Sequence, residues 1–165
     1  MKTIAVTGTP GTGKTTLSKN LAFELNFLYL DVNKLILKNK IYEGYDRKRK
    51  TKIVDINKLN KFLIFEIKNL ETKKFFNKFF CGIIIDSHLS HYLPRKYIDL
   101  CIVTKCDIKD LNKRLEKKKF HKDKIKENIQ AEIFNMCYNE ALERKHKVII
   151  VDTTKTKNLA LLNFL

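Results

Sequence analysis

The sequence predicts an α/β domain of the doubly wound type, with helices on both faces of a parallel sheet. Short apolar runs alternate along the chain with longer segments of helical periodicity, and this alternation is typical of βαβ units. One run, residues 82–86, is apolar until it stops at a carboxylate, which is the pattern of a central strand buried on both faces. The first run leads directly into a glycine-rich stretch, so a ligand is expected at the carboxyl ends of the strands.

Five strands are expected, and each is a short apolar run. Their ranges are 3–7, 27–31, 82–86, 98–104 and 148–152. Because helical segments separate them, the connections should be right-handed crossovers and the sheet should be five-stranded and parallel. Neither a repeat nor a low-complexity linker marks a boundary, so residues 1–165 are expected to form one domain.

Helices are expected where apolar residues recur at helical spacing. Their ranges are about 13–26, 32–40, 107–118, 123–145 and 156–165, with another starting near residue 56. Leu17, Leu21 and Leu25 form the stripe of the first helix. The polar residues 41–55, around Gly44, form an excursion between two of these helices.

Two of these helices have well-marked apolar faces. The face of the helix from residue 56 consists of Leu59, Phe62, Leu63 and Ile67. The segment 123–145 is expected to be a single helix, because one stripe continues along it. That stripe consists of Ile125, Ile129, Ile133 and Met136, widened by Phe134, Cys137 and Ala141.

The strongest motif is residues 8–15, Gly-Thr-Pro-Gly-Thr-Gly-Lys-Thr. It has the pattern of a phosphate-binding loop (P-loop) and stands between an apolar strand and an amphipathic helix, as that motif requires. Its glycines let backbone N–H groups approach phosphate oxygens, and the helix start adds further N–H groups. Lys14 is expected on the β- and γ-phosphates, and the Thr15 hydroxyl on Mg²⁺. An ordinary glycine-rich turn is the alternative.

A carboxylate at the end of the 82–86 run supplies an acid beside the loop. Asp86 is expected to hold Mg²⁺ through a water molecule, with helix capping as the alternative. His88 would orient that carboxylate or an attacking water, or it is a structural histidine. His88 and His91 lie three apart, but without a second ligand pair in the sequence a metal site on them is not expected.

Cations over the transferring group are a requirement of phosphoryl transfer, and a basic hinge at residues 117–122 is placed to deliver them. Arg114, Lys118 and Lys122 are the candidates. A solvated helix face is the alternative explanation for most of the lysines there.

The composition bears on partners and location. Lys and Arg number 34 against 18 Asp and Glu, a formal charge of +16, so nucleic acid is a candidate partner. A lysine-rich composition is equally expected from a biased genome or a hot habitat. No apolar run reaches the roughly 18 residues of a membrane helix, so a cytoplasmic protein without membrane contact is expected. Buried thiols are expected for the cysteines, which lack a Cys-x-x-Cys pair: Cys81, Cys101, Cys106 and Cys137.

Six short motifs follow one another in the chain. They are Gly-Thr-Pro-Gly-Thr-Gly-Lys-Thr-Thr at 8–16, Tyr-Glu-Gly-Tyr-Asp at 42–46, Ile-Ile-Ile-Asp-Ser-His at 83–88, Leu-Pro at 93–94, Arg-Leu-Glu at 114–116 and Glu-Asn-Ile-Gln-Ala-Glu-Ile-Phe at 127–134. In this order they resemble the small nuclear or archaeal adenylate kinase family, of the Fap7 or CINAP type, and the last motif is the most specific. The resemblance implies a P-loop NTPase fold of the nucleoside monophosphate kinase type, with a monophosphate-binding segment at about 31–54 and a short lid at about 117–127.

The resemblance further implies Mg·ATP as donor, AMP as favoured acceptor and some ATPase activity. It also implies transient contact with a small-subunit ribosomal protein and pre-ribosomal RNA during late small-subunit maturation. The residues that it assigns to ATP are Gly11, Gly13, Lys14, Thr15, Thr16 and Lys118, and those that it assigns to the Asp-x-His element are Asp86 and His88.

Two departures from the family pattern concern arginines. The lid position usually held by arginine is Lys118, and the arginine expected in the monophosphate helix falls on Leu37. Lysine lacks the planar two-pronged contact that arginine makes with phosphate. Three functions therefore stay open: an adenylate kinase, a nucleotide-switched ribosome assembly factor with little kinase activity, and a shikimate- or nucleoside-kinase-like relative with another acceptor.

Overall fold

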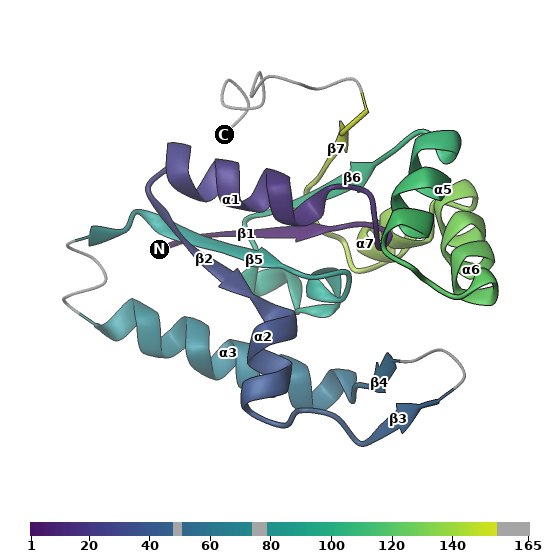
Figure 1. Cartoon of the computed structure of the whole chain (residues 1–165). Coiled ribbons are helices and arrows are strands. Elements are labelled where there is room, and N and C mark those ends of the chain that lie inside the picture. Colours follow the sequence, from purple (N-terminus) through teal and green to yellow (C-terminus); the bar gives the residue numbers. More distant parts are fainter. Residues whose placement is uncertain (48–50, 74–78, 155–165) are drawn as a thin grey trace.

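A parallel five-stranded sheet forms the centre of the molecule (Figure 1). The computed structural model describes residues 1–47, 51–73 and 79–154. The strand order is β2-β5-β1-β6-β7, and each neighbouring pair is parallel. The bounds are β1 (Lys2–Thr7), β2 (Phe27–Asp31), β5 (Gly82–Asp86), β6 (Leu100–Lys105) and β7 (Val148–Asp152). The predicted doubly wound fold is therefore confirmed.

Helices cover both faces of the sheet, with α1 on one face and α2, α3 and α7 on the other (Figure 1). The bounds are α1 (Lys14–Glu24), α2 (Val32–Lys38), α3 (Ile56–Thr72), α5 (Ile108–Lys117), α6 (Lys122–Ile133) and α7 (Met136–Glu143), with the short helices η1 (Ser90–Tyr92) and η2 (Arg95–Tyr97). Successive strand residues point to opposite faces. In β5, Ile84 packs in the α1 core, whereas Ile83 and Ile85 pack in the α3 core. These two cores explain why the strand is apolar throughout.

The predicted apolar faces of two helices are confirmed. In α1, Leu21 is fully buried, and Leu17 and Leu25 pack against the same core. In α3, one face lies in the opposite core: Leu59, Leu63 and Ile67 are buried there and Phe62 is partly buried. Burial of these leucine-sized side chains contributes roughly 1.5–3 kcal/mol each to folding.

The expected excursion at 41–55 includes a small antiparallel hairpin, away from the main sheet. Its strands are β3 (Gly44–Asp46) and β4 (Thr51–Ile53). The hairpin lies beyond the end of α2 (Figure 1). The helix predicted at 156–165 lies outside the described residues.

The prediction of one continuous helix at 123–145 is wrong, because the segment divides into α6 and α7. Asn135, between them, has φ 54°, a left-handed conformation that interrupts the helical path. The apolar stripe divides as well: Ile125 and Ile129 pack against α5, whereas Ile133 and Phe134 are 56% and 67% exposed. A stripe drawn on one straight helix therefore does not describe this segment.

The expectation of buried thiols is also wrong in part. Cys101 and Cys106 are buried and Cys137 is half-buried, but Cys81 is exposed. Cys81 precedes β5, and its backbone N–H donates a hydrogen bond to the carbonyl of Asn26. No helix within the described residues is both long and apolar enough to cross a membrane.

Candidate functional site

The glycine-rich stretch 8–15 connects β1 to α1 and forms the floor of the site. Gly8 has φ +134°, and a Cβ there would collide with the backbone and hydroxyl oxygens of Thr104. Gly13 has φ +93° and is the N-cap of α1. Side chains at these two positions would be strained, so the sequence folds into this loop only because both are glycine.

Lys14 is the first residue of α1 and turns back over the loop. Its Nζ donates a hydrogen bond of 2.9 Å to the carbonyl oxygen of Thr9. Burial lowers the pKa of Lys14 from 10.5 to about 8, although the nearby carboxylates of Asp86 and Glu132 oppose this shift. The nearby carboxylates therefore offset the burial of this ammonium group only in part, and an incoming anion would stabilise it further.

The Asp86 carboxylate is the acid of the site and is 4% exposed at the end of β5. Its Oδ2 accepts hydrogen bonds from the Thr15 hydroxyl at 2.7 Å and from the Tyr29 hydroxyl at 2.8 Å. Burial, followed by the bond to Asp86, raises the pKa of Tyr29. The oxygen atoms of Thr15 and Asp86 are the hard ligands that Mg²⁺ prefers, so these two residues fit a magnesium ion.

His88 follows Asp86 and faces the same space. Burial and then the charge of Lys14 lower its pKa from 6.5 to about 4. The imidazole is therefore neutral near pH 7, with one nitrogen to donate and one to accept a hydrogen bond.

A cavity of about 870 Å³ lies against the P-loop. All the residues that the sequence predicts for nucleotide binding or catalysis line it: Gly11, Gly13, Lys14, Thr15, Thr16, Asp86, His88 and Lys118. Of the other candidate cations, Arg114 lines the cavity, whereas Lys122 does not line it in the described part of the chain. The structure thus brings residues from the P-loop, α1, β5 and α5 to one place.

Sequence reasoning missed several residues of this cavity. Among them are Asn33, Lys117, Lys124 and Thr153. Thr153, just beyond β7, donates a 2.6 Å hydrogen bond to the Thr12 carbonyl and accepts one of 3.3 Å from Arg114. None of these residues stands in a recognisable motif, so only the lysines, through their charge, carried a signal.

A second cavity, of about 290 Å³, adjoins the first. The two share Pro10, Thr51, His88 and Lys124. The second is further lined by residues of η1, α6 and α7, including Tyr92, Asn128 and Glu140. Burial and a bond to Glu140 raise the pKa of Tyr92 to about 12, so its hydroxyl stays protonated.

His91 has partners that the sequence did not reveal. Its Nε2 lies 2.9 Å from Glu140 Oε2, and its Nδ1 lies 2.6 Å from the Thr7 hydroxyl. The possible ligand atoms of His91, Cys137 and Glu140 all lie within 4.8 Å of one another. The second ligand pair that the sequence seemed to lack thus comes from α7, although hydrogen bonds already occupy both ring nitrogens of His91.

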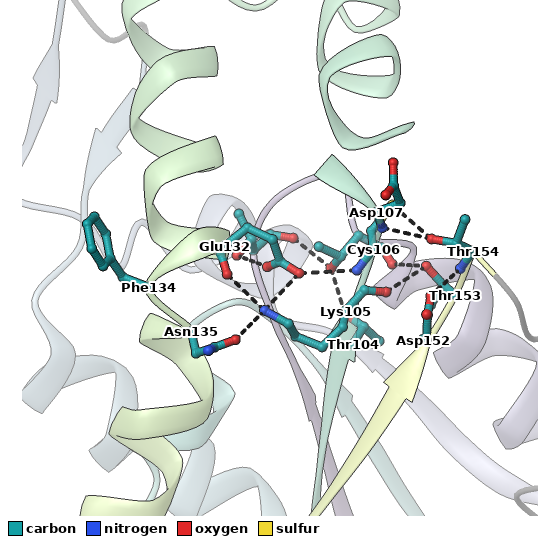
Figure 2. Close-up of polar contacts among 12 residues, drawn as sticks. Thr104, Lys105, Cys106, Asp107, Glu132, Phe134, Asn135, Asp152, Thr153 and Thr154 are labelled. Carbon is teal, nitrogen blue, oxygen red and sulfur yellow. Dashed lines mark hydrogen bonds and ion pairs between the residues drawn. The ribbon is translucent and has the colours of Figure 1, made fainter. Parts of the chain in front are cut away.

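A polar network joins α6 to the other side of the P-loop (Figure 2). At its centre is Glu132, which is 4% exposed. It contacts the P-loop residue Thr9 and, at the end of β6, Lys105 and the backbone N–H of Cys106. In the sequence, Glu132 was noted only as part of the 127–134 motif, because an acidic residue on a helix is ordinarily expected to face solvent.

The relatives of this sequence include proteins named as adenylate kinases. A family model described as "AAA domain" matches residues 4–135. The "Putative adenylate kinase" of Methanocaldococcus jannaschii is 40% identical over 151 residues, which cover 92% of this chain and 76% of that protein. The "Adenylate kinase isoenzyme 6 homolog" of Dictyostelium discoideum is 31% identical over 153 residues, covering 93% and 81%.

Solved structures agree at the level of the fold. Deoxyadenosine kinase from M. mycoides with bound dATP superimposes with a TM-score of 0.56 at 15% identity, covering 99% of this chain and 97% of that one. The same enzyme with bound dCTP gives a TM-score of 0.53 at 16% identity, covering 99% and 100%.

Proposed function

The chain belongs to the adenylate kinase-like family of P-loop proteins that these relatives represent, and from this membership we propose that it transfers the γ-phosphoryl group of ATP reversibly to AMP. ATP is the nucleotide donor in this proposal, and Mg²⁺ is required. The family membership supports a phosphotransferase, and the choice of AMP follows the names of the relatives.

The observation that carries the proposal is the pair of adjoining cavities. In-line phosphoryl transfer needs a donor and an acceptor side by side, with water excluded between them. The larger cavity lies on the P-loop and would take the triphosphate, and the smaller would take the acceptor. His88 and Lys124 line both, so the transferred group would pass beside them.

Each group at the P-loop has a definite part in this scheme. Lys14 would leave the Thr9 carbonyl and bind the β- and γ-phosphates, where its ammonium stabilises the spreading negative charge. Thr15 and Asp86 would hold Mg²⁺, Thr15 through its hydroxyl and Asp86 through a water molecule; the ion supplies charge neutralisation on the phosphates. The neutral His88 would orient Asp86 or an attacking water through hydrogen bonds.

Two segments of the single domain would close over the substrates. The segment at about 31–54 would bind the monophosphate, and the segment at about 117–127 would act as a lid that brings Lys118 to the phosphates, with Arg114 beside it. Thr51, from the first segment, lines the acceptor cavity as well as the larger one, which supports this assignment. Closure without AMP would admit water as acceptor and account for ATPase activity.

The direct test is to supply ATP and Mg²⁺ with a panel of nucleoside monophosphates and to separate the products. ADP should form from ATP and AMP and should require Mg²⁺. A Lys14→Ala protein that turned over normally would contradict the proposal. Fast transfer to a nucleoside or to another acceptor, with none to AMP, would favour the nucleoside-kinase-like alternative.

A second candidate function is a nucleotide-switched factor in small-subunit ribosome (rRNA) maturation. The formal charge of +16 and the exposed apolar side chains of Ile133, Phe134 and Met136 support a macromolecular partner. Binding to pre-ribosomal RNA should weaken steeply with salt, and a small-subunit ribosomal protein should stimulate ATP hydrolysis without AMP. Absence of both effects at low salt would leave the kinase as the better assignment.

A further inference from the structure

Glu132 is a buried carboxylate whose oxygens each have a partner within hydrogen-bond distance (Figure 2). Its Oε2 accepts a hydrogen bond of 2.6 Å from the Thr9 hydroxyl. Its Oε1 accepts one of 3.1 Å from the backbone N–H of Cys106 and lies 3.1 Å from Lys105 Nζ. A buried carboxylate with this many partners has one position, because any movement would leave charge unsatisfied.

Lys105 fixes the helix that carries this carboxylate. Its Nζ also donates to the Glu132 carbonyl at 2.9 Å and to Asn135 Oδ1 at 2.7 Å. The ammonium thus adds a second donor to the Glu132 carbonyl, which also accepts the backbone N–H of Asn135 at the end of α6. Phe134, just beyond α6, extends away from the network in Figure 2. The C-terminal end of α6 is therefore anchored to the end of β6.

Thr9 is bonded to Glu132 through its side chain and to Lys14 through its backbone. Its hydroxyl binds Glu132, while its carbonyl accepts hydrogen bonds from Lys14 Nζ and from the backbone and hydroxyl groups of Thr12. Thr9 itself is 2% exposed. The position of the carbonyl that Lys14 binds before nucleotide arrives is thus coupled to the carboxylate on α6.

We propose that Glu132 is a positioning residue, which acts through Thr9 to hold the first half of the P-loop in the conformation that accepts the phosphates of ATP. The inference rests on the proposed function, since it assigns the loop to ATP. Because Glu132 holds the end of α6 in place, closure of the lid must take place before residue 132, in the segment at about 117–127.

The first test removes the hydrogen bond between Thr9 and Glu132 by changing Thr9, so that the other contacts of Glu132, which support the fold, are kept. Thr9→Val removes the hydroxyl and keeps the branched shape, so Glu132 retains Lys105 and the Cys106 N–H. Isothermal titration with Mg·ATP should show a dissociation constant at least about fivefold higher, the effect of one lost hydrogen bond to a charged group. Thr9→Ser keeps the hydroxyl and should bind within about twofold of the natural protein.

Glu132→Gln supplies the second arm, because it keeps the shape of the side chain and removes its charge. If Thr9 and Glu132 act through one bond, Thr9→Val should cost much less ATP affinity in the Glu132→Gln background than alone. The matched control is Glu143→Gln, which removes the same charge from an exposed position on α7 and should leave ATP binding unchanged.

Both experiments measure ATP binding, so they test the role of Glu132 even if the protein transfers no phosphoryl group to AMP. Melting temperatures of all variants are measured, and titrations are made well below the lowest. Wild-type ATP affinity in Thr9→Val would overturn the inference, and so would fully additive losses in the double variant. A lower melting temperature with unchanged ATP affinity would make Glu132 a purely structural residue and would overturn it equally.

Discussion

The two sides of the nucleotide cavity are built in different ways. On one side is the wall, which we define as residues 8–15 with Asp86, Thr104 and Thr153. Its polar side chains are bonded across the chain, as Thr15 is to Asp86 and Thr153 to the Thr12 carbonyl. Four of them are buried: Thr9, Thr12, Asp86 and Thr104. On the other side is the cover, which we define as the described residues of 31–54 and 117–127. Its residues are mostly exposed, and its lysines at 117–119 lie in solvent.

In the proposed reaction, this difference would separate the groups that must be in place beforehand from those that must move. A wall of fixed donors stabilises charge without reorganisation, which is the efficient form of electrostatic catalysis. Residues 117–127 of the cover include no buried residue, so their displacement should cost little, whereas α2 is held in the core by Val32 and Ile36. Changes in the wall should therefore alter catalysis strongly, and changes in the cover should alter it moderately without affecting folding.

The largest effect is expected for Lys14→Ala in the wall. Loss of the ammonium should lower kcat for ADP formation by roughly 10²–10³-fold, the range seen when one electrostatic donor is removed. The free energy of unfolding should change by about 1 kcal/mol or less, because the lost bond to the Thr9 carbonyl is offset by removal of a buried charge. Steady-state kinetics and thermal unfolding measure the two. A strongly destabilised variant with normal turnover would break the distinction between wall and cover.

Titration of Lys14, a residue of the wall, should change activity and stability in opposite directions as the pH rises. Because the pKa of Lys14 is about 8 in the folded protein and 10.5 is its ordinary value, the unfolded chain binds more protons between these two pH values. The free energy of unfolding should therefore rise with pH in that window. Over the same window kcat/KM for ATP should fall about tenfold per pH unit, because the free enzyme loses its ammonium.

Lys14→Met is the control for this pH dependence. The methionine cannot titrate, so the contribution of this site to the rise in stability between pH 8 and 10.5 should disappear. The natural protein and the variant are compared by chemical denaturation at each pH. Identical slopes in the two proteins would show that Lys14 is not the group responsible.

A moderate effect is expected for Lys118 in the cover. Lys118→Ala should lower kcat about tenfold, and Lys118→Arg should raise it by a few-fold, because a guanidinium binds phosphate through two parallel hydrogen bonds. Both should leave the melting temperature unchanged, since Lys118 is exposed. Lys122→Ala and Lys122→Arg are the matched controls, because Lys122 does not line the cavity within the described residues. Equal effects at the two positions would indicate a general effect of charge.

The sequence predicted the wall better than the cover for a physical reason. Residues 8–15 and Asp86 occupy positions set by local geometry, namely the glycine conformations of a tight loop and the end of a buried strand. Local rules of this kind act over a few residues, so they are visible in sequence. The five strands were predicted for the same reason, because burial on both faces leaves an unbroken apolar run.

What the sequence did not reveal depends on contacts between distant segments. The break at Asn135 follows no glycine or proline, and it accompanies bonds that Lys105 makes from β6. The anchoring of Glu132 joins residues that are 123 positions apart in the chain. The stripe of α6 continued across the break in sequence but not in space, so Ile133 and Phe134 were wrongly expected in the core.

The smallest effect is expected at Leu37, where the family pattern has arginine. Leu37 lies on α2, is 53% exposed and lines neither cavity in the described part of the chain. Leu37→Arg should lower KM for AMP about two- to fivefold, the effect of one exposed ion pair of up to about 1 kcal/mol, with kcat and melting temperature unchanged.

The control for this prediction adds the same charge to the opposite face of the sheet. Phe23, on α1, is 85% exposed, and Phe23→Arg should leave KM for AMP unchanged. If both variants behave alike, the effect comes from net charge, which at +16 is already large. A decrease confined to Leu37→Arg requires α2 to approach the acceptor during the reaction, because the side chain does not reach either cavity in this conformation. That outcome would assign the movement to the cover and leave the wall fixed.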